Sequence, residues 1–131
     1  AVAFLATVTY GAVIVPILHE FKADNIHNIV NHSEAKLLFV GDRAWENLNE
    51  EAMPLLMGIV LLTDFTPVVC RNEQLMEAFE HRNVLYGTRF PKNFRPEHIQ
   101  HRKEESPEEL AVINYTSGTT GYSKGVMLPY R

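Results

Sequence analysis

Ten consecutive residues near the end of the chain, 116–125, hold the side chains whose types and spacing could do chemistry. Their sequence, T-S-G-T-T-G-Y-S-K-G, combines hydroxyl-bearing side chains with three glycines and one lysine. The glycines let backbone N–H groups turn toward a ligand, the hydroxyls donate further hydrogen bonds, and Lys124 adds a full positive charge. A polyphosphate offers acceptor oxygens and negative charges for all of these donors. The residue types therefore predict a phosphate-binding loop.

The spacing within this loop differs from that of the Walker loop. The Walker pattern is G-x-x-x-x-G-K-[ST], whereas the order here is G-x-x-G-x-x-K-G. Residues 110–115, L-A-V-I-N-Y, form a strand-like run directly before the loop. A flexible surface hairpin is the competing interpretation, because Gly, Ser and Thr are common in turns. The lysine at a fixed offset after an apolar strand favours phosphate binding.

The preceding sequence alternates strand-like apolar runs with amphipathic stretches. We predict strands at 12–17, 35–40 and 58–62, a helix at 22–31, and further helices after the capping residues Asp42 and Asn72. The strands are apolar on both faces, which is typical of a parallel sheet covered by helices. The predicted fold class is therefore α/β: a partial three-layer domain with a mostly parallel sheet flanked by helices, ending in the phosphate loop.

Three segments divide this predicted domain. Residues 1–80 carry the βαβ units, 81–109 form an irregular basic loop, and 110–131 hold the last strand and the phosphate loop. Basic side chains dominate the first part of the middle segment, which also contains two prolines (Arg82, Arg89, Lys92, Arg95, Arg102, Lys103; Pro91, Pro96). A solvated loop that balances the acidic residues of 45–80 is the favoured interpretation. The alternative is a basic rim that guides an anionic ligand.

Composition excludes several classes of protein. The chain has 131 residues, of which 46% are hydrophobic and 21% charged, as in an ordinary globular domain. A net charge of -4 gives no overall positive field, so we predict no nucleic-acid partner. The single Cys70 excludes an internal disulfide framework and suits a reducing, cytoplasmic compartment. The uncharged residues 1–18 are interrupted by Gly11 and Pro16, so we predict no transmembrane segment.

Residues 115–121 and 123–128 resemble the phosphate loop of the adenylate-forming, or AMP-binding, enzymes. This superfamily includes acyl-CoA synthetases, peptide-synthetase adenylation domains and beetle luciferases. Residues 10–16, Y-G-A-V-I-V-P, and 31–36, N-H-S-E-A-K, are similar to upstream segments of the same family. Ser123 departs from the pattern, since the family usually has proline there. The sequence looks most like a fragment of the N-terminal domain of a bacterial long-chain fatty-acid–CoA ligase.

The resemblance implies a role for each matching residue. It implies that the β- and γ-phosphates of ATP are wrapped by one run of loop residues (Thr116, Ser117, Gly118, Thr119, Thr120, Gly121). Lys124 would neutralise these phosphates as a transition-state charge stabiliser, and the Thr116 hydroxyl would approach the accompanying Mg²⁺. No further catalytic group is expected within the chain.

The implied enzyme is an acid–thiol ligase, an acyl-CoA synthetase. It would convert a carboxylate and ATP to an acyl-adenylate and pyrophosphate, and then form a thioester with coenzyme A. Its expected partners are ATP and a small-molecule carboxylic acid, and its expected location is the cytoplasm, peripheral to the inner membrane face. An amino-acid or aryl-acid adenylation domain remains an alternative, as does a noncatalytic nucleotide- or phosphate-binding module.

The two ends of the chain suggest a piece of a larger fold. The sequence opens at Ala1 without methionine, and it stops at Arg131, soon after the loop. We therefore expect a fragment that is inactive alone. A cut through an α/β domain leaves a sheet edge unpaired, so we also expect the isolated chain to self-associate.

Overall fold

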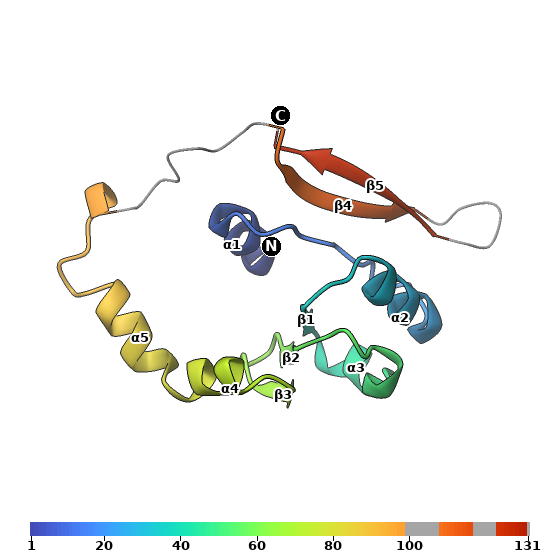
Figure 1. Ribbon diagram of the computed structural model, residues 1–131, viewed down its shortest axis with the longest axis horizontal. Coiled ribbons are helices and arrows are strands. Elements are labelled where there is room, and N and C mark those ends of the chain that lie inside the picture. Colours follow the sequence, from blue (N-terminus) through green and yellow to red (C-terminus); the bar gives the residue numbers. More distant parts are fainter. Residues whose placement is uncertain (99–107, 117–122, 131) are drawn as a thin grey trace.

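The computed structural model describes residues 1–98, 108–116 and 123–130, which form an α/β fold of helices and two small sheets (Figure 1). The helices are α1 (Val2–Tyr10), α2 (Ala23–His32), α3 (Asp42–Trp45), α4 (Glu73–Glu80) and α5 (Arg82–Arg89), with 3₁₀ turns η1 (Glu50–Ala52) and η2 (Pro96–His98). The strands are β1 (Leu37–Val40), β2 (Gly58–Leu61), β3 (Pro67–Cys70), β4 (Leu110–Thr116) and β5 (Lys124–Pro129). Among these described segments, no helix combines the length and apolar character needed to cross a bilayer.

The first sheet has the strand order β1-β2-β3 and carries the core. β1 runs parallel to β2 after a crossover through α3 and η1, whereas β3 returns antiparallel to β2. The core cluster consists of buried apolar side chains from α2, β1, β2 and the segment before β2 (Val30, Val40, Met53, Leu56, Ile59). Helix α2 contributes because its apolar positions Ile26, Ile29 and Val30 recur at helical spacing on one face.

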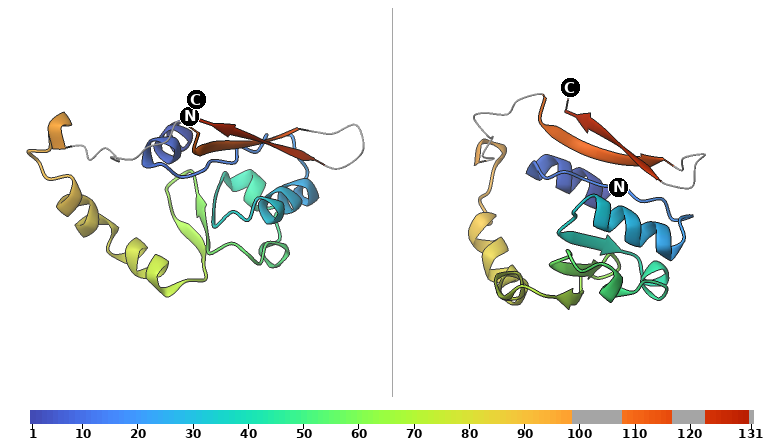
Figure 2. Two further views of the ribbon diagram at one scale, coloured as in Figure 1. Left: turned by 45° about the horizontal axis from the view of Figure 1, so that its top comes forward. Right: turned by 45° about the vertical axis from the view of Figure 1, so that its right-hand side comes forward.

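The second sheet is the antiparallel β4–β5 hairpin. Figure 2 shows the hairpin beside α1 and above α2 in both views. A parallel bridge between Ile14 and Val112 joins it to the segment that follows α1. The two sheets are therefore linked through α1, α2 and the chain between them.

The mostly parallel sheet predicted from the sequence is not what these strands form. Only β1 and β2 pair as parallel neighbours, while β2–β3 and β4–β5 are antiparallel. β2 and β3 are joined by residues 62–66, and a connection this short cannot make the crossover that parallel pairing needs. The strand predicted at 12–17 is reduced, in the described part of the chain, to the single bridge at Ile14. The α/β class itself is confirmed.

The segment predicted as an irregular basic loop contains a regular helix. α5 spans Arg82–Arg89 and follows α4 almost without interruption. Pro91 and Pro96 restrict only the backbone near them, and residues 82–89 contain no proline, so the helix forms before the first of them. No residue of α5 is buried, and Figure 1 shows the α4–α5 arm extending away from the three-stranded sheet.

Arg71 holds the loop before β2 in place. Its Nη1 donates to the carbonyl oxygens of Met53 at 2.8 Å and Leu56 at 3.2 Å, and its Nη2 donates to that of Glu50 at 2.7 Å. Met53 and Leu56 belong to the core, so these bonds tie the exposed guanidinium to the packing around β2.

We therefore expect Arg71→Ala to lower the free energy of unfolding by about 1–3 kcal/mol, because three backbone carbonyls lose the charged donor that bonds them. Denaturant unfolding of both proteins measures the difference. Arg43→Ala is the matched control, since within the described residues the exposed Arg43 side chain makes no hydrogen bond. Equal losses in the two variants would contradict the role assigned to Arg71.

Candidate functional site

The loop end of the β4–β5 hairpin, where residues 117–123 connect the two strands, carries the described part of the predicted phosphate site. Thr116 is the last residue of β4, Lys124 is the first of β5, and the two are direct partners in the antiparallel register. Directly opposed side chains lie on the same face of such a pair, with Cβ atoms about 4.5–5.5 Å apart. Both residues are exposed. A hydroxyl and an ammonium group therefore stand side by side where the chain enters and leaves residues 117–123.

The other predicted binding residues lie outside the described residues (Ser117, Gly118, Thr119, Thr120, Gly121). The structure thus brings together the first and the last of the predicted set, Thr116 and Lys124. It does so through strand pairing, which fixes the two ends of the intervening segment opposite each other.

Tyr115 is packed on the other face of the hairpin, beside the Thr116–Lys124 pair in sequence. Tyr115 is only 5% exposed, and its partner across the ladder is Gly125. A Cβ placed on Gly125 would lie 3.1 Å from Cζ of Tyr115 and 3.2 Å from Cγ2 of Ile113. Since these distances are shorter than ordinary carbon contacts, the Tyr115 ring occupies the space that a side chain at position 125 would take. Gly125 is therefore needed for packing beneath the hairpin.

Three hydrogen bonds fix the hairpin on the side of α1. The N–H of Ile14 donates to the Ala111 carbonyl at 3.0 Å, and the N–H of Ile113 donates to the Ile14 carbonyl at 2.9 Å. At the opposite end of the hairpin, where β4 begins and β5 ends, the Tyr130 hydroxyl donates to the Val8 carbonyl at 2.7 Å. The middle and the far end of the hairpin are thus held independently of the end that carries Lys124.

The end nearest the predicted loop is held by α2. The Tyr115 hydroxyl lies 2.7 Å from Nδ1 of His32, and the two rings meet edge to face with centroids 5.7 Å apart. Burial raises the pKa of Tyr115 above its ordinary value of 10.0, so the phenol keeps its proton at neutral pH. His32 and Tyr115 are 83 residues apart, and no local sequence pattern links them, so their contact could not be predicted from the sequence.

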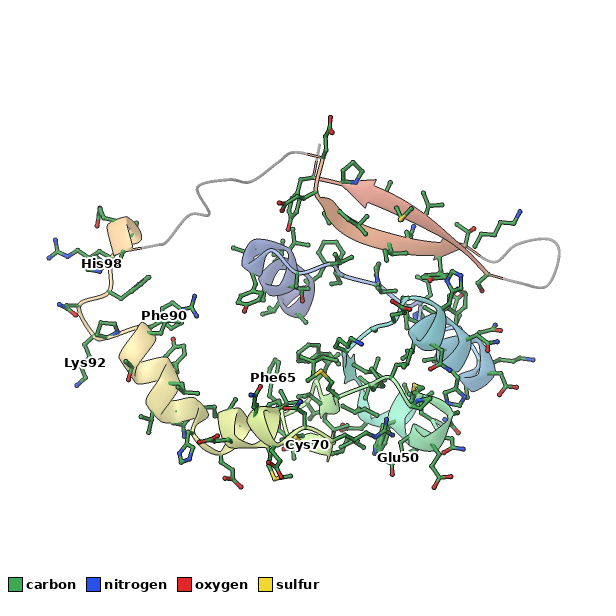
Figure 3. The ribbon with its side chains drawn as sticks, in the orientation of Figure 1. Glu50, Phe65, Cys70, Phe90, Lys92 and His98 are labelled. Atoms are coloured by element: carbon green, nitrogen blue, oxygen red, sulfur yellow. The ribbon has the colours of Figure 1, made fainter. Side chains whose placement is uncertain are left out.

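The basic segment does not line this site in the described part of the chain. Figure 3 shows Lys92 and His98 at the side of the molecule opposite the loop end of the hairpin. The exposed bases of residues 82–95 therefore agree with a solvated segment rather than with a basic rim around the loop.

Two other features of the described residues would indicate a site: a group of metal ligands, and a cavity beside Cys70. Within residues 1–98, 108–116 and 123–130, no group of three His, Cys, Asp or Glu residues could hold a metal ion. A cavity of about 380 Å³ lies between β3 and α4, away from the hairpin, and Cys70 lines it together with Met76 and Phe79. The Cys70 Sγ already donates to the Asn72 carbonyl at 3.6 Å, which gives the thiol a local partner. The hairpin end remains the stronger candidate site.

The chain is similar to known proteins along its whole length. A family model described as "AMP-binding enzyme" matches residues 1–131. Long-chain-fatty-acid–CoA ligase 5 of Rattus norvegicus is 27% identical and covers 97% of this chain, which matches 19% of the relative. Long chain acyl-CoA synthetase 3 of Arabidopsis thaliana is 31% identical over 91% of this chain and 18% of the relative.

A solved structure shares the fold. It is the anthranilate CoA ligase AuaEII in complex with anthranoyl-AMP, which superposes with a TM-score of 0.69 at 21% identity. That match covers 98% of this chain and 22% of the solved one. The chain therefore spans about a fifth of the length of the proteins to which it is similar.

Proposed function

Because the chain belongs to the AMP-binding enzyme family, we propose that it is the phosphate-binding part of an ATP-dependent fatty-acid–CoA ligase. The relatives named above as long-chain ligases support this proposal, and they align with nearly all of the chain. The observation that carries this proposal is the Thr116–Lys124 pair at the loop end of the hairpin. A hydroxyl donor beside an exposed ammonium group suits the oxygens and the negative charge of a polyphosphate.

The proposed first step forms an acyl-adenylate. A carboxylate oxygen of the acid attacks the α-phosphorus of ATP, and the bond from that phosphorus to the bridging oxygen breaks, releasing pyrophosphate. Negative charge develops on the leaving pyrophosphate, and Lys124 acts there as a fixed positive charge. The backbone and hydroxyl donors of 116–121 would hold the β- and γ-phosphates.

The second step consumes the adenylate. The thiol sulfur of coenzyme A loses its proton to solvent and attacks the acyl carbon, the bond from that carbon to the phosphate oxygen breaks, and AMP leaves with that oxygen. Mg²⁺ would arrive bound to the nucleotide phosphates, where it neutralises charge, and the Thr116 hydroxyl is the group of this chain proposed to approach it.

A long-chain fatty acid is the proposed substrate, because relatives that align with the chain are named for it. An aromatic acid is the second candidate, since the solved protein with the same fold is named as an anthranilate CoA ligase. The proposed location is the cytoplasm, peripheral to the inner membrane face, because an acyl chain gains about 0.8 kcal/mol per buried CH₂ in a bilayer.

The experiment uses the longer protein that carries this chain. Formation of AMP is measured with ATP, Mg²⁺ and coenzyme A against a panel of hexadecanoate, benzoate, anthranilate and amino acids. We expect hexadecanoate to give the highest rate. A preference for an aromatic or amino acid would favour the alternative ligases. If no acid supports formation of AMP, the fatty-acid–CoA ligase proposal is contradicted and a noncatalytic phosphate-binding module is favoured.

A further inference from the structure

We propose that the hydrogen bond between His32 and Tyr115 positions the Thr116–Lys124 pair for ATP, an inference that rests on the proposed function. Neither His32 nor Tyr115 is expected to touch the nucleotide. Tyr115 is adjacent to Thr116, and side chains alternate along a strand, so its ring lies on the face opposite the Thr116–Lys124 pair. The two residues act on the site only through the backbone that they hold.

The ring of Tyr115 contacts both strands that lead into the predicted loop. It belongs to β4, and it fills the space beside Gly125 of β5, one residue after Lys124. A contact that fixes this ring therefore fixes the strand ends that carry Thr116 and Lys124. The hydroxyl of the same ring reaches His32 at 2.7 Å, which supplies such a contact.

His32 is a firm attachment point because its neighbours on α2 are anchored. Val30 lies in the core, and Nδ2 of Asn31 donates to the Ala52 carbonyl at 2.7 Å. The hydroxyl of Ser33 closes the helix end on the Val30 carbonyl at 3.1 Å. The position of the hairpin end is thus set by the core around β1 and β2, through the last turn of α2.

The hydroxyl and the imidazole can bond in either direction. A phenol hydroxyl donates to an Nδ1 without a hydrogen and accepts from an Nδ1 that carries one. Either direction holds the Tyr115 ring to α2, which is what a positioning role requires.

Tyr115→Phe and His32→Ala in the longer protein test this inference. Each should raise KM for ATP by roughly 2- to 13-fold, the range that corresponds to the net contribution of one hydrogen bond. The KM for the acid should stay unchanged. In the double variant the KM for ATP should rise little more than in the more affected single variant, because both changes remove the same bond.

Two matched controls separate positioning from general stability. Tyr130→Phe removes a tyrosine hydroxyl that bonds the Val8 carbonyl at the other end of the same hairpin. His27→Ala removes another histidine of α2, whose Nε2 accepts from the Asn49 N–H at 3.0 Å. Both should lower the unfolding temperature and leave KM for ATP unchanged. If Tyr115→Phe alters KM for ATP no more than Tyr130→Phe does, the inference is wrong.

Amide hydrogen exchange gives a second readout that needs no activity. Tyr115→Phe should speed exchange in a peptide covering 116–125, and Tyr130→Phe should not. A longer protein without acid-dependent AMP formation would contradict the proposed function, while the exchange result would still decide the positioning role. Equal exchange in wild type and Tyr115→Phe would contradict the positioning role alone.

Discussion

Replacing Lys124 with alanine in the longer protein is expected to slow adenylation by roughly 10- to 150-fold at subsaturating ATP. The exposed ammonium group at the start of β5 stands beside Thr116, where the charge of the β- and γ-phosphates would gather. A charge-assisted contact of this kind contributes about 1.5–3 kcal/mol. Acid-dependent exchange of labelled pyrophosphate into ATP measures the rate.

The controls for this variant lie in the same chain. Lys124→Arg keeps the positive charge and should retain more of the rate than alanine does. Lys92→Ala removes an exposed lysine on the opposite side of the molecule, as Figure 3 shows, and should leave the rate unchanged. Fatty-acid binding should be the same in all three variants. An unaltered exchange rate in Lys124→Ala would remove Lys124 from the proposed mechanism.

The second large effect is expected for the isolated 131-residue chain, which should form dimers or larger assemblies. Helices α1 and α5 bury no residue, and large apolar side chains are exposed on α1 and on the hairpin (Val2, Leu5, Tyr10, Val126, Met127, Leu128). Burying about 600 Å² of such surface is worth roughly 15 kcal/mol before association costs. A symmetric dimer is the simplest closed assembly that achieves this burial.

Light scattering on a sizing column at micromolar concentration measures this association. Leu5→Lys and Met127→Lys, placed on two of the exposed apolar surfaces, should shift the population toward monomer. Asn28→Lys adds the same charge at an exposed polar position of α2 and should leave the proportion of monomer unchanged. A wild-type chain that elutes as a monomer of 14.9 kDa would contradict the expectation.

Local patterns predicted the elements that hold the site. The strands predicted at 35–40, 58–62 and 110–115 correspond to β1, β2 and β4, and the helix predicted at 22–31 corresponds to α2. Asn72 caps α4 as predicted, because its Oδ1 accepts from the Leu75 N–H at 3.0 Å. The cap predicted at Asp42 is wrong: Gly41 precedes α3, Asp42 is its first residue, and the Asp42 carboxylate accepts from the Thr63 hydroxyl at 2.8 Å instead. Apolar runs act over a few positions, so the sequence displays them directly, whereas a cap also depends on which partner a side chain meets in the fold.

Pairing direction and long-range attachment could not be predicted in this way. Whether β3 returns antiparallel depends on the short turn at 62–66. Phe65 in this turn has a positive φ of 56°, a conformation that is uncommon for phenylalanine and so could not be predicted from the residue type. The His32–Tyr115 bond depends on how α2 packs beneath the hairpin, and Gly125 matters because of the ring beside it. These features arise only from tertiary packing.

Transfer of oxygen-18 from the acid to AMP tests the central claim most directly. The longer protein is supplied with ATP, Mg²⁺, coenzyme A and hexadecanoate labelled in both carboxylate oxygens, and the products are separated by mass spectrometry. Attack of the carboxylate on the α-phosphorus predicts AMP that carries one labelled oxygen, because the thiol later breaks the bond between that oxygen and the acyl carbon. Label in inorganic phosphate or ADP, or AMP without label, would contradict the proposed adenylation.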